Sequence, residues 1–314
     1  MTSFAFVFPG QGSQAVGMLD AWGDHPAVAE TLREASDALD EDVARLIREG
    51  PKEALALTTN TQPVMLVAGV AAWRAWKAEG GADPAAVAGH SLGEYSALVA
   101  AGALTLAQAA PLVRFRAQAM QDAVPVGIGA MAAILGLDPA RVVEVCAEIT
   151  AELGGGETAE AVNFNDPGQT VIAGSKAAVE KACTALKTAG AKRALPLPVS
   201  APFHSSLMKP AAEKLRERLA ATDFAMPTIP VVNNIDVATV TAPDAIRDAL
   251  YRQAFGPVRW IECVKALQAR GITHVVECGP GKVLTGMTKR IDATLSASAV
   301  HDPATLTETR AGLA

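Results

Sequence analysis

The chain has 314 residues, half of them hydrophobic and 19% charged, with a formal net charge of -6. This composition excludes intrinsic disorder, which requires few apolar residues and a high net charge, and the acidic balance excludes the basic surface that nucleic acids require. An anionic substrate would therefore have to be bound by a few local cations.

The N-terminus and the cysteines predict a cytoplasmic protein without membrane contact. The first residues lack the charged start and long apolar stretch of a signal peptide, and no apolar run is long enough to cross a membrane. The four cysteines form no CxxC pair, so we expect reduced core thiols and no metal site.

The first part of the chain alternates short apolar strands with amphipathic helices. A strand is predicted at residues 4–8, where Pro9 and Gly10 stop it, and another at residues 85–89. Helical patterns cover residues 26–39, 61–77, 92–101 and 106–123. This alternation predicts an α/β fold whose parallel sheet is covered by helices.

The middle of the chain predicts a small inserted subdomain. Its elements are a strand at 130–136, a helix at 139–151, strands at 161–165 and 170–173, a helix at 176–189 and a strand at 194–197. The order βαββαβ is that of the ferredoxin-like unit, which can bury its own core. We therefore place a ferredoxin-like subdomain at residues 127–198, inserted into a larger catalytic subdomain formed by residues 1–126 and 199–314.

The larger subdomain continues after the insertion. Helices are predicted at residues 207–221, 245–254 and 261–270, and strands at residues 231–233 and 273–277.

The sharpest local motif is Gly89-His-Ser-Leu-Gly93, which lies between a predicted strand and a predicted helix. Small glycines allow a tight strand-to-helix turn that exposes the serine hydroxyl at a helix N-terminus. Ser91 is therefore the candidate nucleophile, and the backbone N–H of Leu92 could stabilise an oxyanion. The alternative is an ordinary turn serine.

A serine nucleophile needs a general base, and His204 is the best of the five histidines. It lies in an irregular segment stiffened by several prolines, whereas His90 is expected to point away from its neighbour Ser91. The remaining histidines, His25, His274 and His301, suit structural or solvated roles. A lone loop histidine is also often just solvated, so that alternative stays open for His204.

No acidic residue stands out as the third member of a catalytic triad. Asp236 and Asp244 lie in a suitable part of the sequence but in turn-like contexts. A neutral carbonyl or amide oxygen could orient the imidazole instead, which would leave a dyad.

Arg116 falls on the apolar face of the helix predicted at 106–123, whereas Arg114 shares a face with polar residues and is expected to be solvated. A buried guanidinium needs an anion. That anion could be an internal carboxylate or a carboxylate of the substrate, which the planar guanidinium would bind through two hydrogen bonds. In the second case the site would select an acyl group with a free carboxylate, and malonyl is the smallest common one.

The chain closely resembles malonyl-CoA:acyl carrier protein transacylases of bacterial fatty-acid synthesis and the acyltransferase domains of polyketide synthases. The resemblance covers nearly the whole length. It is carried by Phe8-Pro-Gly-Gln-Gly-Ser-Gln14, by Gly89-His-Ser-Leu-Gly-Glu-Tyr-Ser96, and by residues 129–133, 163–165, 196–200, 207–210, 230–234 and 279–284. The fold that it implies is a hydrolase-like α/β core with a ferredoxin-like insertion.

The resemblance also implies roles for single residues. Ser91 would be acylated and His204 would be its base, while Arg116 would hold the malonyl carboxylate. The backbone N–H groups of Gln11 and Leu92 would form the oxyanion hole. A carbonyl oxygen of Gln253 would orient the imidazole of His204, which would explain the missing acid.

The acyl pocket is expected to include Met131 and Phe203. Phe203 precedes the predicted base, as in polyketide acyltransferases that select malonyl groups, and a bulky ring there should leave little room for an α-methyl branch. We therefore expect malonyl to be preferred over methylmalonyl.

The predicted function is transfer of a malonyl group from malonyl-CoA to the phosphopantetheine thiol of acyl carrier protein, for fatty-acid or polyketide synthesis. No cofactor is expected, because the coenzyme A thioester is a substrate. The chain is expected to be a monomer. Candidate docking cations for the carrier protein are Lys192, Arg193, Lys282, Lys289 and Arg290.

Three other functions fit parts of the sequence. A serine hydrolase such as a thioesterase would use the same turn but would need no arginine for a carboxylate. Residues 10–15 imitate a dinucleotide-binding fingerprint, although the acidic partner expected for the ribose, Glu30, falls inside a helical pattern. A non-catalytic docking subunit would not need Ser91, His204 and Arg116 together.

Overall fold

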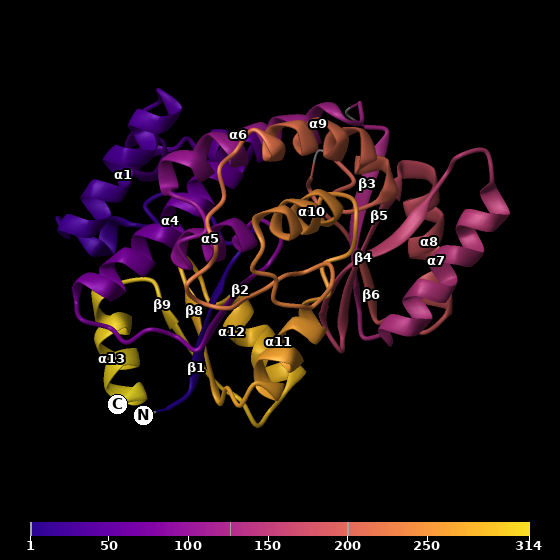
Figure 1. The fold of residues 1–314 in the computed structure, drawn as a ribbon. Coiled ribbons are helices and arrows are strands. Elements are labelled where there is room, and N and C mark those ends of the chain that lie inside the picture. Colours follow the sequence, from indigo (N-terminus) through magenta and orange to yellow (C-terminus); the bar gives the residue numbers. More distant parts are fainter. Residues whose placement is uncertain (1, 126, 200) are drawn as a thin grey trace.

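The apolar N-terminal run forms β1 (Phe4–Phe8), the central strand of the larger of two sheets in the computed structural model, which describes residues 2–125, 127–199 and 201–314 (Figure 1). Its neighbours make the order β7-β2-β1-β8-β9, and each of these pairs is parallel. The other strands are β2 (Ala86–Gly89), β7 (Val231–Val232), β8 (His274–Cys278) and β9 (Ser296–Val300).

The side chains of β1 alternate between two faces of the sheet, and each face has its own core. Phe4, Phe6 and Phe8 pack on one face, where the rings of Trp73 and Trp76 meet Phe6 edge to face. Ala5 and Val7 pack on the other face. Helices therefore cover both faces of the sheet, as the sequence pattern predicts.

Helices surround the larger sheet on both sides (Figure 1). Those before the small sheet are α1 (Pro26–Leu39), α2 (Val43–Glu49), α3 (Lys52–Ala56), α4 (Thr58–Ala78), α5 (Gly93–Ala100) and α6 (Leu106–Asp122), with a 3-10 turn η1 (Asp20–Trp22). Those after it are α9 (Lys209–Ala220), α10 (Pro243–Gln253), α11 (Trp260–Ala269), α12 (Val283–Ile291) and α13 (Pro303–Leu313), with a 3-10 turn η2 (Ser206–Met208).

The second sheet is antiparallel and has the order β4-β5-β3-β6. Its elements follow one another as β3 (Gly129–Leu135), α7 (Pro139–Leu153), β4 (Ala159–Asp166), β5 (Gln169–Ser175), α8 (Lys176–Thr188) and β6 (Arg193–Pro196). They enclose a separate apolar core, and in Figure 1 they form a lobe at one side of the molecule. The predicted class, a parallel α/β core with a small ferredoxin-like unit, is confirmed. The subdomain boundaries at 127 and 198 stay a prediction.

The register of the parallel sheet determines where the candidate site can form. Phe8 at the end of β1 lies opposite Gly89 at the end of β2. The segments that follow these two strands carry Gln11 and Ser91, so both leave the same edge of the sheet. Ligands of open parallel sheets bind at this carboxyl edge.

The structure contains elements that sequence patterns did not predict. Near the C-terminus these are α12, β9 and α13, and near the N-terminus they are α2 and α3. Serine at positions 296 and 298 interrupts the apolar pattern of β9, and Thr and Ala dominate α13, so neither gives a clear periodic signal. No helix in the described part of the chain is long and apolar enough to span a membrane.

Candidate active site

Ser91 occupies a strained turn between β2 and α5. Its backbone φ is 53°, in the left-handed region that a residue with a side chain rarely adopts. The two flanking glycines make this turn possible: a Cβ on Gly89 would lie 1.9 Å from the Gly93 carbonyl carbon, and one on Gly93 would lie 2.0 Å from the Phe8 carbonyl oxygen. The GxSxG pattern is thus required by packing between the ends of β1 and β2 and the start of α5.

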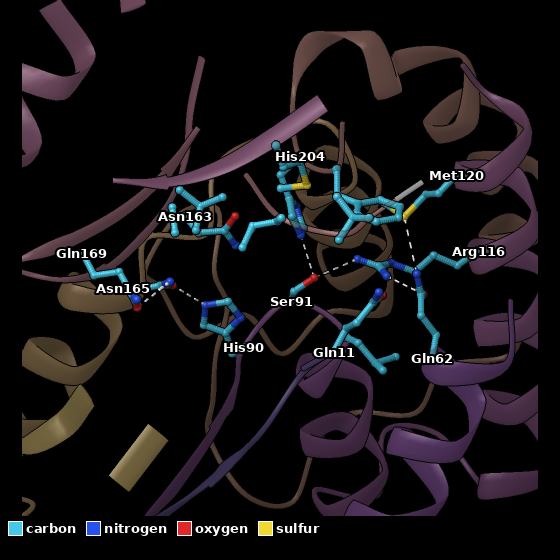
Figure 2. A pocket seen from close by; sticks show the side chains of 17 residues that line it. Gln11, Gln62, His90, Ser91, Arg116, Met120, Asn163, Asn165, Gln169 and His204 are labelled. Carbon is cyan, nitrogen blue, oxygen red and sulfur yellow. Dashed lines mark hydrogen bonds between the residues drawn. The ribbon is translucent and has the colours of Figure 1, made fainter. Parts of the chain in front are cut away.

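His204 lies against the hydroxyl of Ser91. Its Nε2 is 2.6 Å from the Ser91 Oγ (Figure 2). Its Nδ1 is 2.9 Å from the backbone carbonyl oxygen of Gln253. A carbonyl oxygen can only accept a hydrogen bond, so Nδ1 carries the proton and Nε2 accepts from the serine hydroxyl. The imidazole is therefore held in the tautomer that a general base needs.

The electrostatic environment keeps His204 neutral. The residue is only 4% exposed. Burial, reinforced by the positive charge of Arg116, lowers the pKa of His204 from its ordinary value of 6.5 to about 3. A neutral imidazole is consequently available over the whole physiological pH range.

The two aspartates considered for a triad lie elsewhere. Asp236 forms a bidentate ion pair with Arg252, at 2.7 Å for each bond, and Asp244 pairs with Arg247 at 2.7 Å. The His204 imidazole is oriented by a neutral carbonyl oxygen, so the arrangement is a dyad and not a triad.

Arg116 is buried on α6, with 2% of its surface exposed, and its guanidinium points at the serine (Figure 2). One terminal nitrogen donates to the Gln62 Oε1 at 2.6 Å, and the other donates to the Ser91 Oγ at 3.2 Å and to the Gln253 Oε1 at 3.1 Å. All three acceptors are neutral. Among the described residues no carboxylate forms a salt bridge with Arg116, and the nearby buried carboxyl group of Glu94 acts on it only through their electrostatic attraction.

Arg114, two residues earlier, differs from the expected solvated side chain. It forms an ion pair with Glu41 and donates to the Thr59 carbonyl and the Asn60 side chain at 2.8 Å each. These contacts lie outside the pocket, so Arg114 ties α6 to α4 and to the loop between α1 and α2.

A pocket of about 260 Å³ opens in front of Ser91, between the two sheets. Met131 from β3 and Phe203 from the segment before the histidine line it, together with Gln11, Leu92 and Arg116. Neither the Gln11 nor the Leu92 backbone N–H donates a hydrogen bond within the described part of the chain, so both are available to a ligand. The structure thus gathers all eight of the predicted site residues; seven lie in or beside this pocket, and Gln253 lies directly behind it.

Polar side chains form a second wall of the pocket. His90 turns away from Ser91, and its Nε2 lies 2.8 Å from the Asn165 Oδ1 (Figure 2). Asn165 in turn donates to the Gln169 Oε1 at 3.2 Å. Burial lowers the pKa of His90, so this imidazole is neutral as well.

The sequence patterns did not indicate two residues that bind the site: Gln62, which accepts from Arg116, and Asn234, which bridges the serine turn. Gln62 on α4 directly precedes the apolar run at residues 63–72 and is 3% exposed, a signal that could have marked it. Asn234 follows the short strand β7 and has no comparable signal, because an asparagine after a strand is common in turns. Among the described residues no cluster of three potential metal ligands is found, and the four cysteines are unbridged.

Comparisons with known proteins identify relatives along the whole chain. Residues 5–306 match the family described as "Acyl transferase domain". The protein named "Malonyl CoA-acyl carrier protein transacylase" from Salmonella typhimurium is 57% identical over 307 residues, which cover 98% of each chain.

Two solved structures match the fold closely. An acyl-carrier-protein S-malonyltransferase from Burkholderia pseudomallei superposes with a TM-score of 0.96 at 65% identity, covering 99% of this chain and 100% of that chain. A malonyl-transacylase in complex with a type II polyketide-synthase acyl carrier protein has a TM-score of 0.96 at 51% identity, again covering 99% and 100%.

Proposed function

The chain belongs to the acyl transferase family and transfers malonyl groups from malonyl-CoA to acyl carrier protein, and we propose that it does so through a malonyl ester on Ser91. The observation that carries this proposal is the pairing of a serine–histidine dyad with a buried arginine whose hydrogen-bond acceptors, among the described residues, are neutral oxygens. The dyad can carry out acyl transfer, and the positive charge of the Arg116 guanidinium can bind the malonyl carboxylate.

The first half-reaction loads the serine. His204 Nε2 takes the hydroxyl proton while the Ser91 Oγ attacks the thioester carbonyl carbon of malonyl-CoA. The backbone N–H groups of Gln11 and Leu92 donate to the oxyanion of the tetrahedral intermediate. The carbon–sulfur bond then breaks, and the coenzyme A sulfur leaves with the proton from His204.

The second half-reaction transfers the malonyl group from Ser91 to the carrier protein. The phosphopantetheine thiol of the carrier protein gives its proton to His204, and its sulfur attacks the ester carbonyl of malonyl-Ser91. The same two N–H groups stabilise the second oxyanion. The bond to the Ser91 Oγ breaks, and the serine oxygen recovers its proton from His204. No external cofactor enters either step.

Arg116 determines which acyl group is accepted. Its guanidinium lies within hydrogen-bond distance of the Ser91 Oγ, so a carboxylate bound to it would be close to the reacting carbonyl, as the three-carbon malonyl group requires. Phe203 and Met131 close the pocket around the acyl group and leave little room for an α-methyl branch.

Acyl carrier protein is proposed to dock near the pocket through basic side chains. The five cations suggested by the sequence, Lys192, Arg193, Lys282, Lys289 and Arg290, are exposed. One of them, Arg290, already pairs with Asp166 at 2.8 Å, which makes it a weaker candidate than the other four.

The alternative functions are less well supported. A thioesterase has no use for a carboxylate site beside its nucleophile. Dinucleotide binding would need an acidic residue at a strand end, whereas Glu30 lies on an exposed face of α1 and pairs with Arg33.

The direct test of the proposal is the covalent intermediate. The native protein, incubated with malonyl-CoA and quenched with acid, should gain one malonyl group on the peptide that contains Ser91, and holo-acyl carrier protein should remove it. Ser91→Ala should gain nothing. Release of free malonate without an adduct would favour the thioesterase function instead.

A further inference from the structure

Glu94 is a buried carboxyl group that the proposed reaction does not use. It is the second residue of α5 and is 2% exposed, and it lies behind the serine turn, outside the residues that line the pocket. Burying a carboxyl group is costly unless it is hydrogen-bonded, so its contacts need an explanation.

One oxygen of Glu94 accepts two hydrogen bonds. The donors are the backbone N–H of Asn234 and the side-chain Nε2 of Gln253, each at 2.9 Å from Oε2. These donors belong to separate segments, the loop after β7 and the end of α10. A single oxygen atom therefore fixes the distance between the two segments.

The first segment holds the serine turn from both sides. The Asn234 side chain accepts from the Ser91 backbone N–H at 2.7 Å and donates to the Gly89 carbonyl at 2.7 Å. The turn that it bridges is the strained one, with Ser91 at a φ of 53°. Strained backbone persists where surrounding contacts over-determine it, and the Asn234 amide supplies two such contacts.

The second segment holds the base and the arginine. The Gln253 side chain donates to the Ser91 carbonyl at 3.0 Å and accepts from Arg116 at 3.1 Å, while its backbone carbonyl accepts from His204. Displacement of Gln253 would thus move the imidazole, the guanidinium and the serine together.

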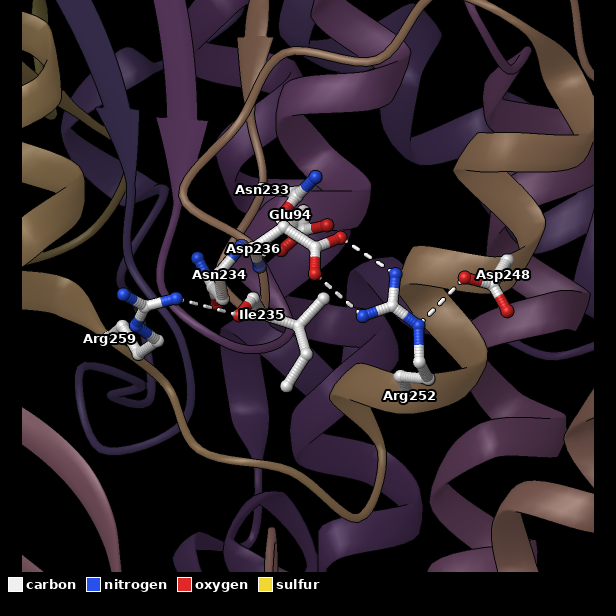
Figure 3. A network of polar contacts seen from close by, with 8 residues as sticks. All are labelled: Glu94, Asn233, Asn234, Ile235, Asp236, Asp248, Arg252 and Arg259. Atoms are coloured by element: carbon white, nitrogen blue, oxygen red, sulfur yellow. Dashed lines mark hydrogen bonds and ion pairs between the residues drawn. The ribbon is translucent and has the colours of Figure 1, made fainter.

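An ion pair braces the same two segments from the outside. Asp236, two residues after Asn234, pairs with Arg252, the residue before Gln253, and Arg252 also pairs with Asp248 at 2.7 Å (Figure 3). Asp236 and Arg252 are each more than a third exposed, so this brace is weak compared with the buried contact at Glu94.

We propose that Glu94 is a positioning residue for acyl transfer. Its Oε2 atom accepts from both Asn234 and Gln253, and this keeps the Ser91 hydroxyl and the His204 imidazole at the distance that the reaction requires. This inference rests on the proposed role of Ser91 as the acylated residue. The effect of Glu94 on the loading rate depends on the position of one acceptor atom and not on the negative charge of the carboxylate.

Three substitutions at Glu94 distinguish the position of its acceptor oxygen from the charge of its carboxylate. Glu94→Gln keeps an acceptor oxygen at the same distance from the helix and loses the charge. Glu94→Asp keeps the charge, but its shorter side chain withdraws the oxygen from both donors. Glu94→Ala removes both. Glu277→Gln is the matched control, because Glu277 is also buried in the sheet core and its Oε2 accepts from the backbone N–H and the hydroxyl of Thr285, away from the pocket.

The test measures the rate constant of Ser91 loading at saturating malonyl-CoA and at saturating acetyl-CoA in the native protein and these four variants, with near-UV circular dichroism to establish folding. Misplacement of reacting groups by about 1 Å costs about 100-fold in rate. We expect Glu94→Ala and Glu94→Asp to lose at least about that much with both substrates. Glu94→Gln should stay within about tenfold of the native rate, and Glu277→Gln within about twofold.

Several results would overturn this inference. A folded Glu94→Ala or Glu94→Asp protein that loads at the native rate would exclude a positioning role. Glu94→Asp loading faster than Glu94→Gln would mean that charge matters and position does not. If the alanine and aspartate variants do not fold, a folded Glu94→Gln protein that loses 100-fold or more would contradict it equally. Failure of the native protein to load Ser91 would instead contradict the proposed function.

Discussion

The Nε2 atom of His204 lies 2.6 Å from the Oγ of Ser91, and the Nδ1 atom of the same ring lies 2.9 Å from a backbone carbonyl oxygen. A neutral peptide oxygen thus takes the place that an aspartate has in a triad. Because a carbonyl adds no full negative charge beside the ring, its hydrogen bond offsets only part of the burial that disfavours the imidazolium.

This arrangement predicts that loading continues in acid. Burial and the Arg116 charge lower the pKa of His204 from 6.5 to about 3, so the ring stays neutral, and active as a base, as the pH falls through 6.5. The rate constant of loading from malonyl-CoA at pH 5 should stay within about twofold of that at pH 7, whereas an ordinary histidine would lose about 97% of its neutral form. A rate that falls with a midpoint near pH 6.5 would contradict the assignment.

The two glycines of the serine turn should be intolerant of a methyl group. A Cβ on Gly93 would lie 2.0 Å from the Phe8 carbonyl oxygen, so Gly93→Ala must displace backbone. We expect it to lower the free energy of unfolding by about 4 kcal/mol or more, or to prevent folding. Gly312→Ala, in α13, is the control: no atom lies within 4 Å of its added Cβ, and the change should be neutral or stabilising by up to about 1 kcal/mol. Urea unfolding measures the free energy of unfolding of both variants. An equal change in Gly93→Ala and Gly312→Ala would exclude a steric clash at Gly93 as the cause.

Replacement of Phe203 should relax the selection against branched acyl groups. The ring is 8% exposed and lines the pocket, so Phe203→Ala enlarges the space next to the acyl group. The ratio of loading from methylmalonyl-CoA to loading from malonyl-CoA should rise at least about tenfold. Methylene-sized contacts in a hydrophobic pocket change discrimination between substrates by about this factor. An unchanged ratio would show that another side chain excludes the branch.

Glu94 should make stability depend on pH in a direction opposite to that of an ordinary salt-bridged carboxylate. Burial raises the pKa of Glu94 from 4.5 to about 7, although the hydrogen bonds from Gln253 and Asn234 lower it. The charges of Arg116 and Asp236 lower and raise it by smaller amounts. The folded state therefore holds this proton more tightly than the unfolded state, and the resulting stability is present below pH 4.5 and is lost as the pH rises to about 7.

Glu94→Gln cannot titrate, so it isolates this effect. The free energy of unfolding of the native protein, minus that of Glu94→Gln, should fall on the order of 3 kcal/mol between pH 4.5 and pH 7.5. Other titrating groups cancel in the difference. A difference that is flat or that rises with pH would mean that Glu94 is ionised throughout this range in the folded protein.

Much of this architecture could be predicted from the sequence, because the relevant signals are local. The strand β1 and the helix α1 have the predicted bounds, since Pro9 ends the one and Pro26 begins the other. Ser91 has a turn motif, and Arg116 is a charge on an apolar helical face. These features depend on spacing within a single element.

The remaining parts of the site depend on contacts between distant segments. The Gln253 carbonyl that orients His204 is a backbone atom, which every residue has, so only family resemblance could point to it. Gln62, Glu94 and Asn234 act through partners more than 50 residues away in the chain. No periodic pattern encodes such partners, and the fold alone brings them together.

The role of Arg116 in substrate selection is tested by comparing malonyl and acetyl loading of Ser91 in the native protein and in Arg116→Ala. Arg114→Ala is the control, because Arg114 lies on the same helix and makes its ion pair outside the pocket. We predict that Arg116→Ala loses at least about 100-fold in loading from malonyl-CoA, the value of a charge-assisted bidentate contact, while loading from acetyl-CoA holds or rises. If both substrates lose equally in a folded protein, Arg116 does not bind the malonyl carboxylate and the proposed basis of selectivity is wrong.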